Sequence, residues 1–382
     1  MKDKKAYQYP WRHNNSFQVL VDGADYFSAM LDEINNARFL ILFETYLFES
    51  GKTSDDFIHA LCEAKLRGVE IFVLLDEYGS KNLNKNDKQK LINKGVNLLD
   101  YNPTSFFHIG KSLKRDHRKL LLVDDRVAFV GGAGVTDSFN SGIDTHYWHD
   151  IMLKMEGDIV FDLKHSFNDI WHQKKTPFQK NNFQPNVTGE QQNNKSRVIV
   201  STGAEKNEII RTIINHIRSS KKHVWLTSPY FISSWKIRRA LRYAAKKGID
   251  VRLIFPGSIS DHKWVTYGIQ RYYQRLLKSN IAIYEYQPRF SHAKIISCDN
   301  WFTIGSSNFD RWNQFLNLDL NVEVFNSEAN DEIIKFFKSD FSNSKLIALS
   351  KWSSRSPLQH LKEWCAGLII TILGFISRKF KR

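Results

Sequence analysis

Two copies of one short pattern constrain this chain more than any other feature of its sequence. The pattern is His-x-Lys-x4-Asp, and its copies contribute six residues: His117, Lys119, Asp124, His292, Lys294 and Asp299. A glycine-containing segment follows each copy, at 131–134 and at 305–308. A motif that returns together with its surroundings indicates a duplicated structural unit. We therefore expect two similar lobes, each carrying one copy.

The predicted secondary structure repeats in the same way. Apolar runs and helical periodicity predict a strand, a helix and a second strand in each half. These segments are 37–48, 57–67 and 69–76 in the first half, and 222–230, 237–247 and 251–255 in the second. Strands that alternate with helices are typical of α/β units. The expected fold class is α/β, with two pseudo-twofold related lobes whose mixed, largely parallel sheets are sandwiched around one shared active site.

Composition divides the chain into four parts. The segment 173–196 is rich in Asn, Gln and Lys and contains two prolines, which is typical of a linker. We therefore predict a first lobe at 1–172 and a second lobe at 197–344, each with one copy of the motif. A basic, partly apolar C-terminal tail at 345–382 completes the chain.

The tail combines an apolar run with a basic end. Residues 364–376 are mostly apolar, and as a helix they would span about 20 Å, less than the roughly 30 Å hydrocarbon core of a bilayer. Lysines and arginines flank the run. These features favour a helix that lies in the interface of an anionic membrane. The alternative is a last helix packed on the core of the protein.

The charge of the whole chain indicates what it binds. The net charge is +15, which favours polyanionic partners: nucleic acid, an anionic lipid surface or phosphate-containing substrates. The three cysteines, Cys62, Cys298 and Cys365, are scattered along the chain. Their number and spacing argue against a disulfide framework and against a Cys-ligated zinc site.

The spacing within each copy predicts which side chains act together. Residues i and i+2 of a strand share a face, so His117 should lie beside Lys119, and His292 beside Lys294. An imidazole next to an ammonium group suits a phosphate, because the lysine supplies charge and the histidine attacks or exchanges protons. The pattern alone makes all six residues catalytic candidates. The aspartates, however, follow their lysines at an odd interval, which favours the opposite face and a stabilising role within each lobe.

The paired motifs and the segments after them resemble the phospholipase D superfamily. The order of further matching stretches resembles bacterial cardiolipin synthases, most closely the B type. These stretches are Phe43-Glu44-Thr45-Tyr46, Leu74-Leu75-Asp76-Glu77-Tyr78-Gly79-Ser80, Phe129-Val130-Gly131-Gly132, Glu156-Gly157, Ser228-Pro229-Tyr230-Phe231 and Gly305-Ser306-Ser307-Asn308-Phe309-Asp310. The sequence lacks the long N-terminal membrane hairpin of other cardiolipin synthases, which favours the B type. Two positions depart from the family pattern: Gly134 stands where Asn is usual, and Asp319 stands where Glu is usual.

The resemblance implies a mechanism without a metal or other cofactor. His117 would attack phosphorus and form a covalent phosphatidyl-histidine. His292 would protonate the leaving alkoxide and then deprotonate the incoming alcohol. Lys119, Lys294 and Asn308 would hold the phosphoryl oxygens, where charge rises in the transition state.

The resemblance also implies supporting carboxylates. Asp150 and Asp319 would orient the histidines, as a carboxylate fixes an imidazole tautomer. Glu44, at the end of a predicted strand, is a weaker candidate for the site. His146 and His149 lie close to Asp150 in sequence, but no matching ligand spacing elsewhere supports a metal site.

The function that the resemblance implies is a phosphatidyltransferase that joins two phosphatidylglycerols into cardiolipin and releases glycerol. Its expected partners are phospholipids and an anionic membrane surface rather than nucleic acid. The expected location is the cell membrane, as a peripheral or monotopic protein on the cytoplasmic side. The alternatives are a phosphodiesterase of the same superfamily, acting on phospholipid or nucleic acid, and a catalytically inactive membrane-binding scaffold.

Overall fold

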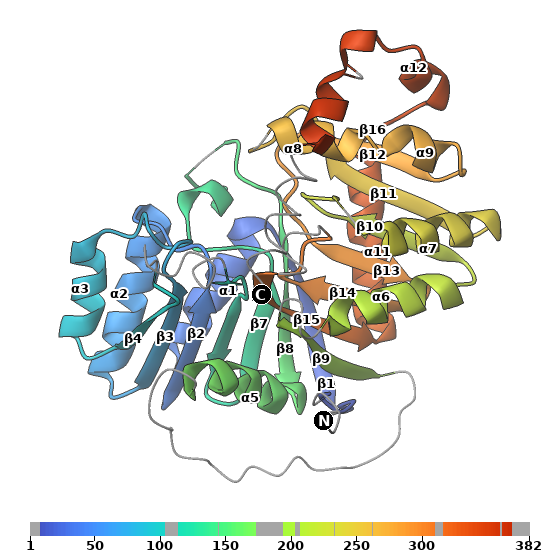
Figure 1. Cartoon of the computed structure of the whole chain (residues 1–382). Helices are drawn as coiled ribbons and strands as arrows, with labels where there is room; N and C mark the ends of the chain where they lie inside the picture. The colour runs from blue at the N-terminus through green and yellow to red at the C-terminus, as the bar shows by residue number, and fades with distance from the viewer. Residues whose placement is uncertain are drawn as a thin grey trace, which may run out of the picture.

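A computed structural model of the chain shows two lobes, each built on its own sheet (Figure 1). The structure describes residues 8–103, 114–143, 145–172, 194–202, 207–232, 234–261, 263–309, 316–359 and 361–368. Within these residues, strand pairing gives one sheet of seven strands and one of nine. The two-lobe α/β fold that the repeated motif predicts is confirmed.

The first sheet has the strand order β1-β8-β7-β6-β2-β3-β4. In that order, the strands are β1 (Asn15–Val21), β8 (Ile151–Gly157), β7 (Val127–Gly131), β6 (Leu120–Val123), β2 (Leu40–Thr45), β3 (Glu70–Asp76) and β4 (Asn97–Tyr101). The ladder β2-β3-β4 is parallel, because helices α2 (Lys52–Leu66) and α3 (Lys85–Asn93) return the chain between its strands. The other pairs are antiparallel.

The second sheet repeats this order as β9-β15-β14-β13-β10-β11-β12. Its strands are β9 (Lys195–Thr202), β15 (Asn317–Phe325), β14 (Trp301–Gly305), β13 (Ile295–Cys298), β10 (His223–Thr227), β11 (Asp250–Pro256) and β12 (Ala282–Tyr286). Two further strands extend it, β16 (Ser344–Leu346) beside β12 and β5 (Arg115–Asp116) beside β15. The matching order shows that the sequence repeat is a structural repeat.

The expectation of largely parallel sheets is wrong outside the ladders β2-β3-β4 and β10-β11-β12. The strand that follows each motif, β6 or β13, turns directly into the next strand, β7 or β14. Such a short turn can join only antiparallel neighbours, whereas a parallel pair needs a longer crossover. Each sheet is therefore mixed.

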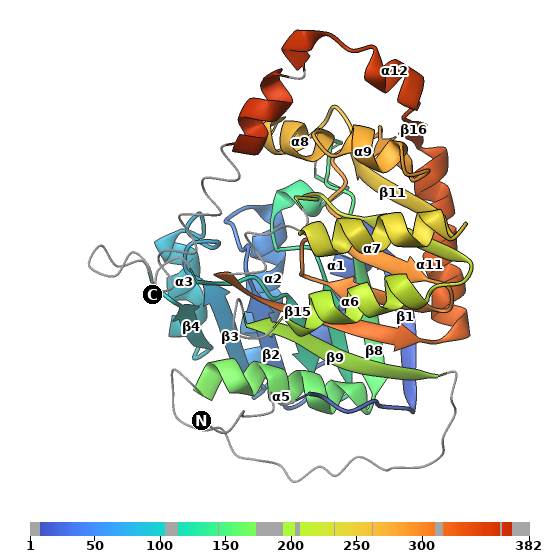
Figure 2. The same ribbon diagram turned by 45° about the vertical axis from the view of Figure 1, so that its right-hand side comes forward.

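The two sheets pack face to face, and helices cover their outer faces (Figures 1 and 2). Helices α1 (Asp22–Asn35), α2 and α3 cover the first sheet, as one outer core shows. Helices α6 (Glu208–Ser219), α7 (Trp235–Lys246), α8 (Lys263–Gln270) and α9 (Tyr273–Leu277) cover the second. Helices α5 (Ile159–His172) and α11 (Ser327–Ser342) contribute to the core between the sheets.

Side-chain alternation along the motif strands builds these layers. In β6, Leu120 and Leu122 enter the core between the sheets, whereas Leu121 and Val123 enter the outer core of the first lobe. Successive strand residues point to opposite faces, so a strand buried on both sides reads as a continuous apolar run. In β14 and β15, residues such as Phe302 join the same central core. The residues that precede β6 and β13 therefore emerge where the two sheets meet.

The predicted boundaries can be compared with these elements. Helix α5 ends at His172, where the first lobe was expected to end. Strand β9 begins at Lys195, inside the predicted linker, of which residues 173–193 lie outside the described residues. Strand β16 crosses the predicted start of the tail at 345, and a short helix, α12 (Leu349–Ser353), follows it. Residues 369–382 of the tail lie outside the described residues, and no helix in the described part is long and apolar enough to span a membrane.

Candidate active site

Each motif histidine is attached through its backbone to the other lobe. The amide of His117 donates a hydrogen bond of 3.0 Å to the carbonyl of Leu318, next to the pairing of β5 with β15. The amide of His292 donates one of 2.7 Å to the carbonyl of His149. Leu318 and His149 occupy equivalent places, because each directly precedes an aspartate expected to orient a histidine. The two lobes thus exchange the same backbone contact.

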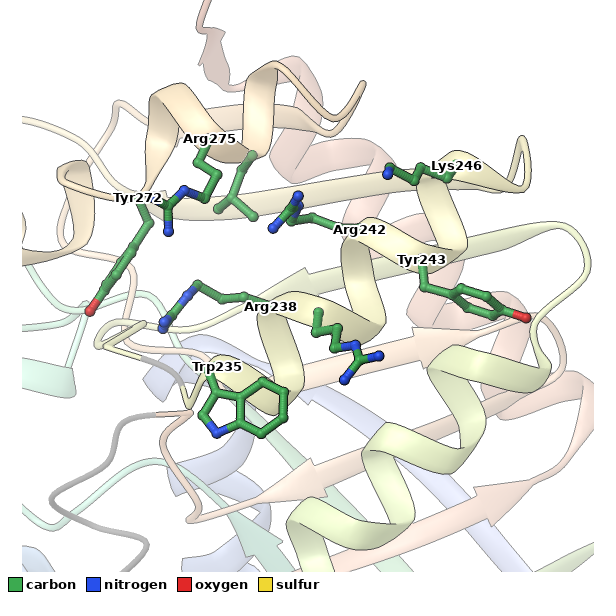
Figure 3. A pocket seen from close by; sticks show the side chains of 9 residues that line it. Trp235, Arg238, Arg242, Tyr243, Lys246, Tyr272 and Arg275 are labelled. Atoms are coloured by element: carbon green, nitrogen blue, oxygen red, sulfur yellow. The ribbon is translucent and has the colours of Figure 1, made fainter.

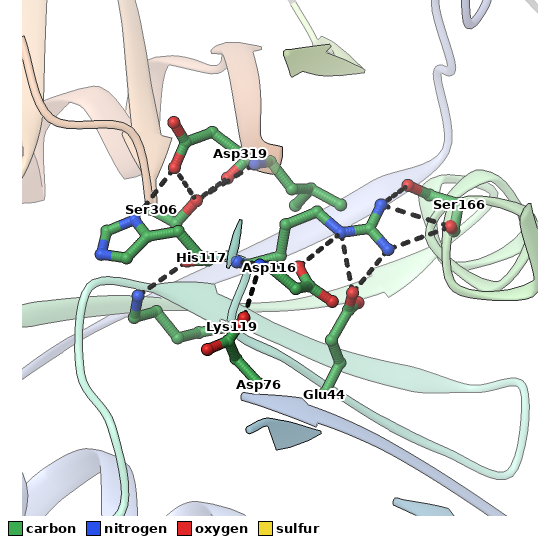
Figure 4. Close-up of polar contacts among 10 residues, drawn as sticks. Glu44, Asp76, Asp116, His117, Lys119, Ser166, Ser306 and Asp319 are labelled. Atoms are coloured by element: carbon green, nitrogen blue, oxygen red, sulfur yellow. Dashed lines mark hydrogen bonds and ion pairs between the residues drawn. The ribbon is translucent and has the colours of Figure 1, made fainter. Parts of the chain in front are cut away.

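The aspartates complete this exchange. Nδ1 of His117 lies 3.0 Å from Oδ1 of Asp319, and Nδ1 of His292 lies 2.7 Å from Oδ2 of Asp150 (Figure 4 shows the first pair). Each ring is therefore oriented by a carboxylate from the opposite lobe. Because Nδ1 is engaged in both rings, Nε2 is the nitrogen left for chemistry. The sequence predicted the aspartates, and the structure adds that they cross between lobes.

Each motif lysine donates to the backbone carbonyl of its own histidine. Nζ of Lys119 donates a hydrogen bond of 2.7 Å to the carbonyl of His117. Nζ of Lys294 donates one of 2.6 Å to the carbonyl of His292 and lies 2.9 and 3.1 Å from its two ring nitrogens. Both lysines are buried. The shared face that the i and i+2 spacing predicts is thus present in each copy.

Burial and mutual repulsion shift the pKa values of all four groups. Burial, followed by the charge of Lys119, lowers the pKa of His117 to about 4. Burial, followed by the charge of Lys294, lowers the pKa of His292 to about 3. Burial lowers the pKa of Lys119 to about 7, with the charge of Lys294 as the next cause, and the pKa of Lys294 to about 8. Positive charges from both lobes thus repel one another in the site. A bound anion would offset this repulsion and raise the lowered pKa values, so the site favours an anion.

The segments after the motifs differ between the lobes for steric reasons. A Cβ at Gly132 would lie 2.6 Å from Oδ2 of Asp150, so a side chain there would displace the carboxylate that holds His292. The equivalent Ser306 donates a hydrogen bond of 3.0 Å to Asp319. A Cβ at Gly134 would lie 2.6 Å from Cβ of Leu47, which excludes the asparagine that the family pattern has there.

Asn308 therefore supplies a carboxamide that the first lobe lacks. Its side chain is buried, and Oδ1 has no hydrogen-bond partner among the described residues. A buried polar atom without a partner costs free energy, so its retention needs a reason. A substrate that brings a hydroxyl or a protonated group to this atom would remove the cost.

The motif aspartates, by contrast, do not face the histidines. The carboxylate of Asp124 accepts backbone hydrogen bonds from Arg38, Phe39 and Leu40. Asp299 accepts the equivalent bonds from the amides of 221–223. Each aspartate thus anchors the start of the neighbouring strand, β2 or β10. Their inclusion in the catalytic set is wrong in geometric terms, and the odd interval from lysine explains why.

Glu44 is also engaged away from the histidines. It is fully buried and accepts hydrogen bonds of 2.8 and 2.5 Å from the guanidinium of Arg118 (Figure 4). Arg118 also donates to Ser166 and lies 3.5 Å from Asp116. Burial, followed by the charge of Glu44, raises the pKa of Asp116 well above its usual range. Glu44 therefore supports the segment that carries the motif through its ion pair with Arg118.

Aromatic rings cover both histidines. The ring centroids of Phe139 and Trp148 lie 5.3 Å from that of His292, and Phe290 lies at 5.8 Å. Tyr46 lies 5.0 Å from His117. Such walls keep water away from the imidazoles and contribute to their lowered pKa values. Sequence reasoning missed this shell, because it converges from loops of both lobes, and only Tyr46 and Phe290 lie near a recognised stretch.

His149, named beside His146 as a possible metal ligand, has another role. Its ring bonds Asp22 at 2.7 Å and Asp340 at 3.0 Å. It also stacks between Tyr286 and Phe336, with centroids at 4.9 and 5.4 Å. Despite burial, the two carboxylates raise the pKa of His149 to about 9. Within the described residues, no group of three His, Cys, Asp or Glu side chains could hold a metal ion.

Comparison with known proteins agrees with this geometry. Residues 30–171 and 213–341 match the family described as "Cardiolipin synthase, PLD-like domain". The chain belongs to this family of phospholipase D-like phosphatidyltransferases. The resemblance drawn from the motifs is thereby confirmed at the level of the family, whereas the B type stays a prediction.

Individual relatives extend over most of the chain. The cardiolipin synthase of Geobacillus thermodenitrificans is 29% identical over 91% of this chain and 70% of the relative. That of Clostridium perfringens strain 13 is 28% identical over 95% of this chain and 78% of the relative. A probable cardiolipin synthase of Bacillus subtilis, YwiE, is 28% identical over 94% of this chain and 72% of the relative.

Two solved structures share the fold. Phosphatidylserine synthase of Haemophilus influenzae superposes with a TM-score of 0.75 at 12% identity, covering 94% of both chains. Polyphosphate kinase of Porphyromonas gingivalis superposes with a TM-score of 0.62 at 14% identity, covering 88% of this chain and 49% of the kinase. At these identities, the likeness concerns the fold alone.

Proposed function

We propose that this enzyme transfers a phosphatidyl group from one phosphatidylglycerol to another, making cardiolipin and releasing glycerol. The observation that carries the proposal is the crossed arrangement of two buried His-Lys pairs, each ring oriented by an aspartate of the other lobe. Membership in the cardiolipin synthase family supports the choice of substrate. We place the reaction at the anionic surface of the cell membrane, on its cytoplasmic side, with the enzyme bound peripherally or monotopically.

In the first step, Nε2 of His117 attacks the phosphorus of the donor lipid. The bond from phosphorus to the glycerol headgroup breaks, and a phosphorus–nitrogen bond to His117 forms. His292 gives its Nε2 proton to the leaving glycerol oxygen. The lowered pKa of His117 supports this role, because its ring is neutral and nucleophilic at physiological pH.

In the second step, the roles of His292 and the alcohol are reversed. His292 removes the proton from a glycerol hydroxyl of a second phosphatidylglycerol. That oxygen attacks phosphorus, the bond to His117 breaks, and cardiolipin leaves. Water in place of the alcohol would give phosphatidic acid, so the aromatic rings around His292 favour transfer by limiting access of water.

The lysines and Asn308 stabilise the phosphoryl oxygens in both steps. Two ammonium groups supply the positive charge that a metal ion provides in other phosphoryl-transfer enzymes. Donor binding also has a consequence for protons. Burial and the charge of Lys294 lower the pKa of His292 to about 3, so the negative phosphodiester must raise it before the ring can act as an acid. We therefore expect donor binding to take up a proton.

Product analysis tests the proposal. Wild-type protein, given phosphatidylglycerol in detergent micelles with a chelator, should form cardiolipin and glycerol in equal amounts. Phosphatidic acid as the main product would instead indicate a lipid hydrolase, and nicking of plasmid DNA a nuclease. Either result would refute the transfer reaction.

Trapping the intermediate tests the two histidine roles. His292→Ala, mixed with a labelled donor whose nitrophenol headgroup leaves without an acid and denatured at alkaline pH, should retain phosphatidyl label on His117, whereas His117→Ala should retain none. Intact-protein mass spectrometry gives the readout. Label on His292 in the His117→Ala protein would show that the roles are exchanged.

A further inference from the structure

A basic and aromatic groove lies on the outer face of the second lobe, away from the histidines. Helices α7 and α9 form a hollow of about 390 Å³ (Figure 3). Its lining consists of Trp235, Arg238, Arg239, Arg242, Tyr243, Lys246, Tyr272, Arg275 and Leu276. Five of these nine residues are cationic and none is acidic. The groove therefore favours an anionic ligand.

The sequence around the groove carries charge of one sign only. Residues 235–247 contain six Lys or Arg, and residues 263–280 contain four, with no Asp or Glu in either segment. The buried face of α7 consists of apolar residues such as Ile237 and Leu241, so its basic residues fall on the outer face. This accumulation of positive charge does not stabilise the helix, because like charges three or four residues apart repel each other.

Contacts within the groove hold two of its arginines in place. The guanidinium carbon of Arg238 lies 4.1 Å from the ring centroid of Tyr272. Nε of Arg242 donates a hydrogen bond of 3.1 Å to Ser279, which leaves its other nitrogens toward the groove. Ordered guanidinium groups bind phosphate oxygens well, because little conformational entropy is lost on binding.

Exposed aromatic and apolar side chains accompany the charge. Trp235 and Tyr243, at the rim of the groove, are 52% and 46% exposed. Nearby, among the described helical residues 361–368, Gly367 lies against Arg271, the residue before Tyr272. That helix exposes Leu361, Trp364 and Leu368, which recur at intervals of three and four residues. Tryptophan, tyrosine and arginine together are typical of the interface of a bilayer.

We propose that the α7–α9 groove docks the second lobe on an anionic bilayer, with lipid phosphates bound between Arg238, Arg242 and Arg275. Trp235 and Tyr243 enter the headgroup layer beside them. The proposal rests on the proposed function, since a substrate with two acyl chains stays in the bilayer and the enzyme must come to it. The exposed Leu361 and Leu368 favour a lipid surface over a DNA duplex, which offers them no apolar layer.

Vesicle binding without turnover tests this surface. Full-length protein carrying His117→Ala would be mixed with equimolar phosphatidylglycerol and phosphatidylcholine vesicles, and the bound fraction measured by sedimentation. Adding Arg239→Glu, Lys246→Glu and Arg275→Glu, all at exposed positions, should reduce the partition coefficient by about 100-fold or more. The neutral set Arg239→Gln, Lys246→Gln and Arg275→Gln should lose less. Thermal unfolding would verify that each variant is folded.

A matched control separates the groove from general charge. Lys335→Glu, Lys338→Glu and Lys345→Glu change the net charge by the same amount at exposed positions on α11 and β16. This variant should bind vesicles within about threefold of its parent. Equal losses in the groove and control variants would overturn the proposal. So would a groove variant that keeps vesicle binding but loses affinity for a DNA duplex. Because the readout is binding, wild-type protein that makes no cardiolipin would refute the proposed function and leave this result standing.

Discussion

Each histidine of the site takes its ring orientation from an aspartate in the other half of the chain. Asp319 holds His117, the proposed nucleophile, and Asp150 holds His292, the proposed acid and base. The two carboxylates should therefore support different events. Asp319 keeps the lone pair on Nε2 of His117, whereas Asp150 stabilises the imidazolium that donates a proton.

Asparagine substitutions should separate these events. Asp150→Asn and Asp319→Asn should each lower kcat by about 100-fold or more, with a smaller change in KM. A donor lipid with a nitrophenol headgroup needs no acid to leave, so it should restore the rate of the first step in Asp150→Asn only. Release of nitrophenol in a single turnover measures this step. Asp319→Glu, which introduces the usual residue of the family, is the control and should keep most activity. Equal rescue of both asparagine variants would contradict the assignment.

The pH dependence of kcat/KM should reflect the free enzyme's shifted pKa values. His117 has a pKa lowered to about 4, so its ring stays neutral and reactive down to about that pH. Lys119 has a pKa lowered to about 7, so charge that binds the donor is lost as the pH rises through this value. An acid limb near pH 4 is expected in detergent micelles. The decline above it should reflect both the proton that His292 must take up and the loss of charge on Lys119. An acid limb at the ordinary pKa of histidine, near 6.5, would show that the site is more hydrated than the structure indicates.

Local sequence rules could predict part of this site. The i and i+2 interval places each lysine beside its histidine, and the odd interval sends Asp124 and Asp299 elsewhere. No such rule pairs Asp319 with His117, because that contact depends on how the two sheets face each other. For the same reason, the sequence did not predict the ion pair of Arg118. Its partner Glu44 could be recognised only as an isolated charged residue in an apolar strand.

At the scale of elements, helix α11 joins the lobes beside the site. It brings Asp340 and Phe336 to His149, while α1 brings Asp22 from the first lobe. Arg289 also contacts Asp22, so the buried cluster contains both signs of charge. The backbone of His149 binds that of His292, and Asp150 follows directly. A change at His149 can therefore affect His292 in two ways: through their backbone hydrogen bond and through the adjacent Asp150.

His149→Leu should reveal the pH dependence of this junction. Leucine is the residue at the equivalent position 318, and it would leave Asp22 and Asp340 without their imidazolium. The folded-state pKa of His149 is raised to about 9, so its stabilisation is complete below about pH 6.5 and lost as the pH rises through 9. The difference in unfolding free energy between wild type and variant should fall by on the order of 3 kcal/mol from pH 6 to pH 10. Urea unfolding at several pH values measures it, and a difference independent of pH would refute the role of this charge.

Periodicity found most elements but not their pairing. The buried strands β2, β3, β10 and β11 and the helices α2 and α7 lie within a few residues of their predicted places. Periodicity does not predict the antiparallel halves of both sheets, because it does not distinguish the short turn after Val123 from a crossover connection. Strand β5 has only two residues and pairs with the other lobe, so no local pattern could have indicated it.

At the scale of the whole molecule, the lobes are not independent domains. One continuous core contains inward residues of both sheets, such as Leu122 and Ile304. Strand β5 of the first lobe is part of the second sheet. Separating the lobes would expose that core and remove an aspartate from each histidine.

Producing the two lobes as separate fragments should therefore abolish activity, and combining the fragments should restore it. Fragments 1–172 and 194–382, produced separately, should each be inactive because each lacks the other's orienting aspartate. Produced together, they should copurify in equal amounts and recover cardiolipin synthesis, since the shared core drives their association. Size exclusion and product analysis give the readout. Activity in either fragment alone would show that the crossed contacts are dispensable.

The exchanged aspartates also bear on where such a chain comes from. A single half would possess a histidine and a lysine but no carboxylate to turn the ring, whereas two identical halves about a twofold axis would supply each other's. Two copies of one such lobe could therefore complete both sites as a homodimer. When both halves belong to one polypeptide, the sequence of each can change independently. Asn308 at the position equivalent to Gly134, and His149 at the position equivalent to Leu318, are two such differences. A single chain with two different halves thus allows a division of labour that two identical halves would not.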